Sequence, residues 1–336
     1  MTRRYLLFAL VIVLAAACWA PVCAKVDFRG FDFEAHRGGR DEYPENTLAA
    51  FRHAIELGAT TLELDLQLTR DLVPVLGHNP RLVYSVTRDP NGRWLTPAHE
   101  PVVHNLLLSE IETYDVGGIN PADTEYYADH GKAQKVSPHE RVPTLDALFE
   151  MVEKMGNTRV CFNVETKSYA TEPSYGTDPY TFTAIVLEVI KRHHLENRCI
   201  IQSFDWRTLI ETRRLDKSMT TSALTCEVPE WGEEGWYRHV GEKGSSPWMA
   251  GLDIDDYDGD YVKAAHAINA DIISPYLVEL TPALVAEAHT FGMKVVPWTV
   301  NKREDMERLI GWGVDGLITD RPTLLKQVLD ARGIRY

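Results

Sequence analysis

Two acidic residues, Glu63 and Asp65, lie two positions apart in a segment that is otherwise rich in leucine. The segment 61–68 reads TLELDLQL, so an extended strand would place both carboxylates on one face and the leucines on the other. Buried carboxylates on one face repel each other and are costly to remove from water unless a cation lies between them. The spacing therefore predicts a site for a hard divalent metal ion, with half-exposed carboxylates on an edge strand as the alternative.

A histidine follows this acidic strand along the chain. The turn-prone pair at 70–71 lies between two extended runs and predicts a hairpin. One register of this hairpin places His78 opposite Asp65, and another places it opposite Glu63. Either register brings an imidazole to the carboxylates, where it could carry a proton near neutral pH. At the turn, the pairings would be Arg70 with Val73 in the first register and Thr69 with Leu72 in the second.

Further polar groups end two other predicted strands. His36 and Arg37 precede two glycines, and together they supply an imidazole, a fixed cation and a backbone that can approach an anion closely. Asn163, Glu165 and Lys167 alternate along another strand and share one face. Glu165 could complete the metal site, and Lys167 could hold a phosphate oxygen. Taken singly, each residue is more often structural, but together they form a set of acid, base, metal ligands and anion-binding cations.

The elements that must position these residues follow a regular pattern. Short apolar runs, expected to be buried strands, alternate with amphipathic stretches and lie at 33–36, 61–68, 160–166, 199–204, 221–225, 271–275, 294–300 and 316–319. Thr144 and Pro282 mark helix starts, and Gly58, Gly156 and Gly292 mark helix ends. Repeated strand-helix units over about 250 residues favour an α/β fold of the TIM-type (β/α)8 barrel class over an open doubly wound sheet. No glycine-rich dinucleotide or P-loop fingerprint follows a strand, which weakens the open-sheet alternative.

The stretch from about 80 to 142 interrupts this alternation. It is rich in Pro, Asn, Asp, Tyr and His, and only 106–114 has a helical pattern. We expect an insertion that lies over the mouth of the barrel as an inserted lid segment after the second strand hairpin. Its apolar and aromatic residues favour an ordered, packed segment over a disordered one.

The first 24 residues have the pattern of a secretory signal peptide. A basic start at 1–4 precedes an apolar run at 5–17, and the small residues at 22–24 permit cleavage after Ala24. We therefore expect a signal peptide at 1–24 and an exported, periplasmic or secreted domain at 25–336. Lipoprotein anchoring at Cys18 is a minor alternative, because the preceding residues only loosely resemble a lipobox. No later segment is apolar enough to predict a transmembrane segment in the mature chain.

The composition restricts the partners and the redox chemistry. A net charge of −14 without a basic stripe argues against nucleic acid as the substrate. A small anionic substrate would then be held by a few local cations or by a metal ion. Beyond residue 24 the chain has three cysteines, Cys161, Cys199 and Cys226, an odd number that excludes a disulfide framework. They are expected to be small buried residues, with one bridge between adjacent strands as an alternative. The sequence does not specify an oligomeric state.

Several short motifs occur in an order that resembles the glycerophosphodiester phosphodiesterase family, from about residue 33 to 325. These motifs are HRG at 36–38, PENT at 44–47, ELD at 63–65, HN at 78–79, NVETK at 163–167, QSFD at 202–205, PWTVN at 297–301 and GVDGLITDRP at 313–322. So many motifs in one order are highly specific. The long insertion after His78 is similar to that of the periplasmic members of the family.

The resemblance implies a TIM-type barrel and a role for each of nine residues. The implied general acid and base are His36 and His78. The implied ligands of one divalent cation, Ca²⁺ or Mg²⁺, are Glu63, Asp65 and Glu165. The implied substrate contacts are Arg37 and Lys167, which bind the phosphate, and Phe204 and Trp298, which form apolar walls of the pocket. The implied reaction converts a small-molecule glycerophosphodiester into glycerol 3-phosphate and an alcohol. The resemblance also implies that the segment ending at His78 is a hairpin arm, separate from the eight barrel strands.

The chain departs from the family pattern at two positions. The family hairpin commonly has Asp-Gly where this chain has Asp71 and Leu72, and leucine disfavours the positive φ of a tight turn, so a longer turn is an alternative. The usual His-Asp pair is His78 and Asn79, which removes a charge near the site. Glu45 lies where a helix is expected to begin, and we predict that it caps the helix rather than taking part in catalysis.

Two other functions are compatible with parts of this pattern. The first is phospholipase D-like action on lysophospholipids or sphingolipids, which would need an exposed apolar entrance; the acidic composition and the polar insertion argue against it. The second is a catalytically silent protein that binds phosphorylated polyols. Such a protein would be expected to lack a histidine or a carboxylate of the set, and here both histidines and all three carboxylates are present.

Overall fold

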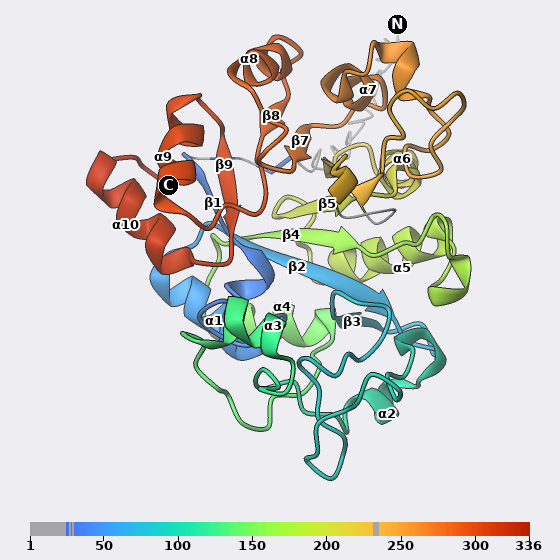
Figure 1. Cartoon of the computed structure of the whole chain (residues 1–336), viewed down its shortest axis with the longest axis vertical. Coiled ribbons are helices and arrows are strands. Elements are labelled where there is room, and N and C mark those ends of the chain that lie inside the picture. The colour runs from blue at the N-terminus through green and yellow to red at the C-terminus, as the bar shows by residue number, and fades with distance from the viewer. Residues whose placement is uncertain (1–24, 27, 29, 231–234) are drawn as a thin grey trace, which may run out of the picture.

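The computed structural model describes residues 25–26, 28, 30–230 and 235–336, and its centre is a parallel β-barrel (Figure 1). Neighbouring strands pair in the order β8-β7-β6-β5-β4-β2-β1-β9. The strands are β1 (Asp32–Ala35), β2 (Thr61–Leu68), β4 (Cys161–Thr166), β5 (Cys199–Ser203), β6 (Thr220–Thr225), β7 (Ile272–Pro275), β8 (Lys294–Val295) and β9 (Gly316–Thr319). Backbone hydrogen bonds from Asp315 to Val295 (2.9 Å) and from Ile318 to Pro297 (3.1 Å) join the two ends of this order. The ring is therefore nearly closed, and the predicted TIM-type barrel is confirmed.

Helices cover the outside of the barrel, as the alternating pattern predicted. The longer helices are α1 (Leu48–Leu57), α4 (Leu145–Lys154), α5 (Pro179–Arg192), α6 (Trp206–Leu215), α7 (Tyr261–Ala267), α8 (Pro282–Thr290), α9 (Arg303–Gly311) and α10 (Pro322–Arg332). The short helical segments are η1 (His36–Gly38), η2 (Val103–Asn105), α2 (Leu108–Ile111), α3 (Thr124–Tyr126), the π-helix η3 (Tyr127–Gly131), η4 (Pro173–Tyr175) and η6 (Ile254–Tyr257).

Local sequence explains where the helices begin and end. Thr144 caps α4 by accepting a hydrogen bond of 3.0 Å from the backbone N–H of Ala147, as predicted. Gly58 ends α1 at φ +94°, a conformation that glycine adopts without a steric penalty. Helix α1 begins at Leu48, because the Thr47 side chain takes the N-cap position.

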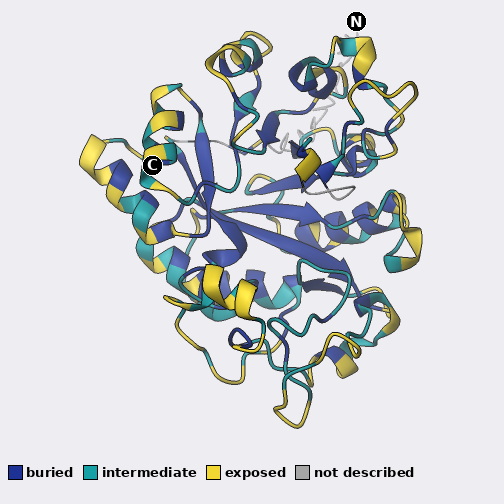
Figure 2. Cartoon of the chain, in the orientation of Figure 1, coloured by how far each residue is buried: buried dark blue, intermediate teal, exposed yellow. Residues whose placement is uncertain are grey.

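The apolar core lies mostly between the barrel and its helices. Strands β2 and β4 are buried along most of their length, whereas the outer helices expose one face (Figure 2). The leucines of β2 point into this outer core, and Glu63 and Asp65 occupy the alternate positions, as the strand pattern predicted. A second, smaller apolar cluster contains Val26, Ile200, Ile272, Val296 and Ile318. Alternation along the strands therefore leaves the carboxylates of β2 for the interior of the barrel.

The strand β3 (Pro74–Leu76) forms the predicted antiparallel hairpin arm with β2, but in a register that differs from both predictions. Leu66 lies opposite Leu76, and the backbone N–H of Thr69 bonds to the carbonyl of Val73 at 3.1 Å. The turn therefore holds three residues, 70–72, which is the longer turn that the departure from Asp-Gly allowed. Leu72 lies at the end of this turn with φ +61°.

The stretch 80–142 has its own small apolar cluster, which includes β3. Its buried members are Val75, Leu82, Val103, Ile111 and Val142. The expected helix at 106–114 is restricted to α2. A second helical segment, α3 followed by η3, was not predicted from the sequence, because none of its residues is buried and it has no apolar periodicity. That this stretch acts as a lid stays a prediction.

The described residues test the predictions for the cysteines and for membrane-spanning segments. Cys199 and Cys226 carry free thiols, so no disulfide joins Cys161 to Cys199 on the adjacent strand, and the alternative of a bridge between adjacent strands is wrong. Within the part of the chain that the structure describes, no helix combines the length and the apolar character needed to span a bilayer. The predicted signal peptide at 1–24 lies outside the described residues.

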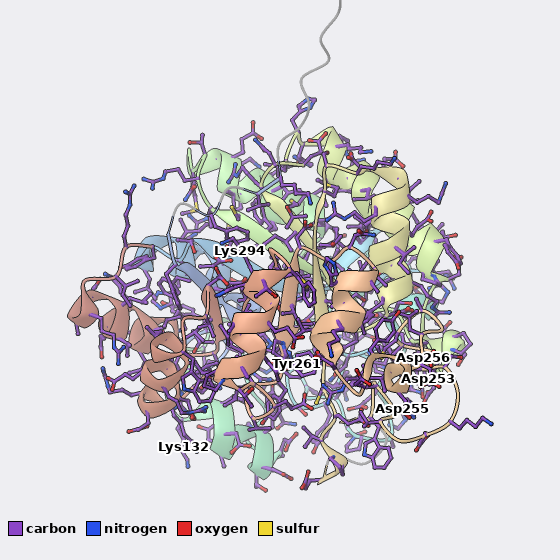
Figure 3. The ribbon with its side chains drawn as sticks, turned by 90° about the horizontal axis from the view of Figure 1, so that it is seen from above. Lys132, Asp253, Asp255, Asp256, Tyr261 and Lys294 are labelled. Atoms are coloured by element: carbon purple, nitrogen blue, oxygen red, sulfur yellow. The ribbon has the colours of Figure 1, made fainter. Side chains whose placement is uncertain are left out.

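The loop before α7 carries part of the negative charge of the chain. Figure 3 shows Asp253, Asp255 and Asp256 close together at the edge of the molecule. Asp253 accepts a hydrogen bond of 3.0 Å from the backbone N–H of Asp255 and caps η6, and Asp260 caps α7 in the same way. These two carboxylates therefore stabilise helix N-termini.

Candidate active site

The first site residues lie where β1 ends and the chain turns sharply. His36 and Arg37 begin the short helix η1, in which Arg37 has φ +51° and Gly38 has φ +85°. A Cβ atom on Gly38 would lie 2.6 Å from the Cβ of Ala50 in α1, so only glycine fits this approach. The turn directs the backbone N–H of Arg37 toward β2, where it donates a hydrogen bond of 2.8 Å to Glu63 Oε2.

Three carboxylates form a compact cluster beside this turn. Glu63 and Asp65 come from β2, and Glu165 comes from β4, where it lies directly opposite Asp65 in the parallel register. Oxygen atoms of the three side chains lie within 4.8 Å of one another, and all three residues are buried. The predicted grouping of carboxylates is therefore present, and its oxygen donors fit a hard divalent cation such as Ca²⁺ or Mg²⁺.

Two cations contact the carboxylate cluster from the side. Lys167 Nζ lies 2.7 Å from Glu165 Oε1 and 3.1 Å from Asp65 Oδ1. Arg37 Nε lies 3.2 Å from Asp65 Oδ2. Asp65 also accepts a hydrogen bond of 2.9 Å from the side-chain amide of Asn46. Both predicted phosphate-binding cations are thus held next to the predicted metal ligands.

Burial and mutual repulsion separate the pKa values of the three carboxyl groups. Burial raises the pKa of Glu63 well above its usual range, and the charges of Asp65 and Glu165 raise it further. Burial raises the pKa of Glu165 to about 7, although Lys167 opposes this shift. Burial alone would also raise the pKa of Asp65, but Lys167 and Arg37 hold it well below its usual value. A cation between the three groups would favour their ionised forms and so lower the two raised pKa values.

The two histidines are oriented by different partners. His36 Nδ1 lies 2.5 Å from Asp320 Oδ1, and His36 Nε2 lies 3.9 Å from Glu63 Oε2. His78 Nδ1 lies 2.8 Å from Asn79 Oδ1, so the side chain of Asn79 orients this imidazole. Burial lowers the pKa of both imidazoles. For His78 the charges of Arg37 and Lys167 lower the pKa further, to well below its usual range.

A cavity of about 290 Å³ collects these groups at one end of the barrel. Of the nine residues predicted from the sequence, eight line it: His36, Arg37, Glu63, His78, Glu165, Lys167, Phe204 and Trp298. The ninth, Asp65, is fully buried and contacts the cations of the site.

One side of the cavity is aromatic. The rings of Phe204 and Trp298 meet edge to face with centroids 5.5 Å apart, and Tyr276 packs against Trp298 at 5.2 Å. The indole N–H of Trp298 donates a hydrogen bond of 2.9 Å to the backbone carbonyl of Ser274, which fixes the ring. The cavity thus has a charged side and an apolar side, and Phe204 and Trp298 lie on the apolar side.

Three further residues of the site were not assigned a role from the sequence. Asp320 accepts hydrogen bonds from Arg40 Nε (2.8 Å) and Asn301 Nδ2 (2.6 Å) in addition to its contact with His36. Burial alone would raise the pKa of Asp320, but Arg40 and His36 hold it well below its usual range. Asn301 and Asp320 lie in two of the motifs that carried the resemblance, whereas Arg40 had no signal beyond its nearness to His36.

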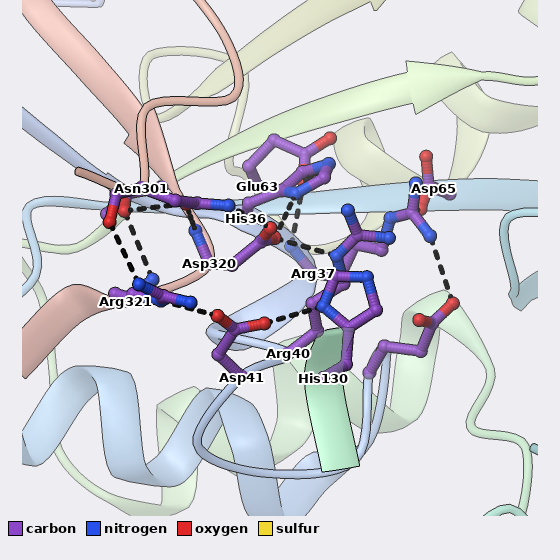
Figure 4. A network of polar contacts seen from close by, with 12 residues as sticks. His36, Arg37, Arg40, Asp41, Glu63, Asp65, His130, Asn301, Asp320 and Arg321 are labelled. Carbon is purple, nitrogen blue, oxygen red and sulfur yellow. Dashed lines mark hydrogen bonds and ion pairs between the residues drawn. The ribbon is translucent and has the colours of Figure 1, made fainter. Parts of the chain in front are cut away.

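These residues belong to a longer polar network (Figure 4). Asp41 accepts from Arg321 Nε at 2.6 Å and contacts His130 Nδ1 at 2.6 Å, and Arg321 donates to the carbonyl of Asn301 at 3.3 Å. The network connects the π-helix η3 with the loops that follow β1 and β9. Segments far apart in the sequence are therefore joined at the site.

Glu45 has a different place from the predicted one. Its carboxylate contacts Arg37 Nη1 at 3.1 Å and accepts a hydrogen bond from the hydroxyl of Tyr126. Thr47, not Glu45, caps α1, so the prediction that Glu45 caps the helix is wrong. Helix formation needs only one side chain at the N-cap, and this leaves the carboxylate of Glu45 to pair with a buried guanidinium.

The chain matches the glycerophosphoryl diester phosphodiesterase family over residues 36–324, a range that contains every residue of the site. The protein belongs to this family. Membership makes it a phosphoric diester hydrolase and confirms the resemblance of its motifs. A glycerophosphodiester phosphodiesterase of Caldanaerobacter subterraneus subsp. tengcongensis is 31% identical over 293 residues, which cover 87% of this chain and 94% of that protein.

Other members of the glycerophosphoryl diester phosphodiesterase family extend the comparison. Human glycerophosphodiester phosphodiesterase 1 is 28% identical over 281 residues, covering 80% of this chain and 71% of the human protein. A crystal structure assigned to the family, from Silicibacter pomeroyi DSS-3, shares 32% identity and a TM-score of 0.77 over 93% of this chain and 95% of that chain. The fold and the family thus agree over nearly the whole described chain.

Proposed function

We propose that the protein is an exported, metal-dependent enzyme that hydrolyses glycerophosphodiesters to glycerol 3-phosphate and an alcohol. The observation that carries this proposal is the meeting of two imidazoles, three carboxylates and an arginine-lysine pair around one cavity. Two proton-transfer groups beside an anion-binding centre are the parts that cleavage of a phosphodiester needs.

The charge balance of the site supports a divalent cation. Five carboxylates of the described site face three fixed cations: Glu45, Glu63, Asp65, Glu165 and Asp320 against Arg37, Arg40 and Lys167. With all five carboxyl groups ionised, the excess of two negative charges would equal the charge of one Ca²⁺ or Mg²⁺ ion. Glu63, Asp65 and Glu165 would hold the ion, because their oxygens converge and because burial makes Glu63 and Glu165 costly to ionise without it. When bound, the ion would supply Lewis-acid stabilisation of charge on the phosphate oxygens.

The residues of the chain account for the remaining steps. Arg37 and Lys167 would bind the phosphate oxygens and hold the diester against the charged side of the cavity. One of His36 and His78 would remove the proton of the attacking hydroxyl or water, and the other would protonate the departing alcohol oxygen. Phe204 and Trp298 would pack against the carbon skeleton of the substrate and exclude water from that side. The stretch 80–142 would act as a lid.

The test is release of glycerol 3-phosphate from glycerophosphocholine by the protein lacking residues 1–24, with Ca²⁺, Mg²⁺ or EDTA, beside the variant His36→Ala. Metal-dependent release that is lost in the variant is the expected result. Release of choline from lysophosphatidylcholine but not from glycerophosphocholine would instead assign the protein to the lipid-directed alternative. Export is tested separately, by expressing the full chain and sequencing the N-terminus of the secreted product, which is expected to begin at Lys25.

A further inference from the structure

A strap at residues 124–135, made of α3, η3 and the residues up to Lys135, lies against the segment 40–45 that follows His36 and Arg37. Side-chain and backbone groups of the strap contact five of the six residues of that segment. Tyr126 contacts Glu45, and His130 contacts Asp41. Gln134 Nε2 donates a hydrogen bond of 2.7 Å to the backbone carbonyl of Arg40. The backbone N–H of Lys135 donates to the carbonyl of Glu42 at 2.9 Å, and Lys135 Nζ lies 5.2 Å from the ring centre of Tyr43.

The contacts that hold the strap to the site are mainly polar. No residue of α3 or η3 is buried. The ring of Tyr126 packs against His130 with centroids 4.8 Å apart, so the two anchoring side chains also support each other. Because the strap buries little apolar surface, its position depends on these polar contacts rather than on a hydrophobic core.

The Tyr126 contact leads directly to a substrate-binding group. The hydroxyl of Tyr126 donates to Glu45 Oε2, and Glu45 Oε1 accepts from Arg37 Nη1 at 3.1 Å. On its other edge, Arg37 Nε lies 3.2 Å from Asp65 Oδ2. The guanidinium is therefore held from two sides, by a barrel carboxylate and by a carboxylate that the strap orients.

We propose that Tyr126 is a positioning residue, which fixes the Arg37 guanidinium through Glu45 and so sets the affinity of the site for the phosphate group of its substrate. The inference rests on the proposed function, because it assigns Arg37 to the substrate phosphate. A guanidinium binds two phosphate oxygens only when its plane is correctly oriented, and a preorganised plane avoids the entropic cost of ordering it on binding. Without the phenol, Glu45 loses one of its two restraints and Arg37 gains rotational freedom.

The experiment compares Tyr126→Phe with Tyr127→Phe. The first variant keeps the ring and its packing on His130 and removes only the hydroxyl. The second makes the same chemical change at the adjacent residue of the strap, whose side chain is 39% exposed. Three quantities are measured with metal present: KM and kcat on glycerophosphocholine, and the dissociation constant of inorganic phosphate by calorimetry.

For Tyr126→Phe we expect KM and the phosphate dissociation constant each to rise by about tenfold, the effect of one hydrogen bond to a charged group, with kcat within about twofold of the wild type. Tyr127→Phe is expected to match the wild type in all three. In a Glu45→Gln background, Tyr126→Phe should raise KM and the phosphate dissociation constant little further, because the connection from Tyr126 through Glu45 to Arg37 is already broken.

A Tyr126→Phe protein with unchanged KM and phosphate affinity would overturn the proposal. So would an effect that adds in full to that of Glu45→Gln, because additivity means that the two residues act separately. If the wild type binds phosphate but releases no glycerol 3-phosphate, the proposed function fails, while the phosphate measurement still decides whether Tyr126 acts on Arg37. A wild type that releases glycerol 3-phosphate but does not bind phosphate overturns the inference about Tyr126 alone.

Discussion

His36 Nδ1 lies 2.5 Å from Asp320 Oδ1, although the two residues are 284 positions apart in the chain. Asp320 is fully buried, and the charges of Arg40 and His36 overcome the effect of burial and keep its pKa well below the usual range. An ionised carboxylate only accepts hydrogen bonds, so Nδ1 of His36 must carry the proton. This leaves Nε2 of His36, which lies 3.9 Å from Glu63, as the atom that can exchange a proton in the cavity.

The first prediction concerns this pair. Asp320→Asn is expected to lower kcat by about a hundredfold, because the amide has no charge to stabilise a charged imidazole and can donate as well as accept, which allows the wrong tautomer. General acid-base catalysis contributes about 10²-fold or more. The melting temperature should change far less than the activity. The measurement is steady-state release of glycerol 3-phosphate together with thermal unfolding of the same preparations.

The matched control is Asp146→Asn. Asp146 contacts His193 Nε2 at 2.8 Å, but the pair lies on α4 and after α5, outside the cavity. The control should retain the wild-type kcat. An Asp320→Asn enzyme with near wild-type kcat would show that His36 does not depend on this carboxylate.

The second prediction follows from the raised pKa values of Glu63 and Glu165. In the metal-free protein the folded-state pKa of Glu165, about 7, lies above that of an unfolded carboxyl group, about 4.3. Such a group stabilises the fold at low pH, and its contribution is lost as pH rises through the folded-state pKa. With EDTA present, stability should therefore fall between about pH 5 and pH 8.

Added metal should reverse this loss. Ca²⁺ or Mg²⁺ must bind ionised carboxylates, so the rise in melting temperature on adding metal should be larger at pH 8 than at pH 5. At a metal concentration 100 times the Kd, the expected stabilisation is about 2.7 kcal/mol. Glu165→Gln should weaken both effects, whereas Glu150→Gln, on the exposed face of α4, should not. An equal metal effect at both pH values would place the metal elsewhere.

Much of the fold could be predicted because its signals are local. Alternation along 61–68 assigned Glu63 and Asp65 to one face and the leucines to the other, and strand register then brought Glu165 opposite Asp65. Caps such as Thr144 depend on side chains within one turn of the helix. These features need no knowledge of distant contacts.

The missed parts depend on contacts between distant segments. Asp320 meets His36 only because barrel closure brings β9 beside β1, and nothing in the local sequence of either residue states which partner it takes. The helical segments α3 and η3 of the strap were missed because their polar side chains anchor them without an apolar face. The hairpin register differs by one residue from each predicted register because Leu72 adopts φ +61°, a conformation that leucine disfavours.

The third prediction assigns the roles of the two histidines. A departing alcohol needs a proton, but a p-nitrophenolate leaving group does not, so the variant that lacks the general acid should regain activity on a p-nitrophenyl phosphodiester. His36→Ala and His78→Ala should both be nearly inactive on glycerophosphocholine, and only one of them should be rescued by the activated substrate. Rescue of both, or of neither, would contradict a mechanism that uses one histidine as acid and the other as base.

The fourth prediction concerns the turn of the hairpin that carries His78. Leu72 lies at φ +61° with 43% of its surface exposed, and a left-handed conformation costs a residue with a Cβ atom about 1 kcal/mol. Leu72→Gly is therefore expected to raise the free energy of unfolding by a few tenths to about 1 kcal/mol, because glycine adopts this φ freely but also gains entropy in the unfolded chain. Leu72→Ala keeps the Cβ atom and is the control, expected to give no gain in the free energy of unfolding.

Chemical denaturation of the wild type and the two variants measures the difference. The kcat should stay unchanged in both variants, since Leu72 lies outside the residues that line the cavity. Equal stability of the Gly and Ala variants would mean that the turn carries no backbone strain at this position.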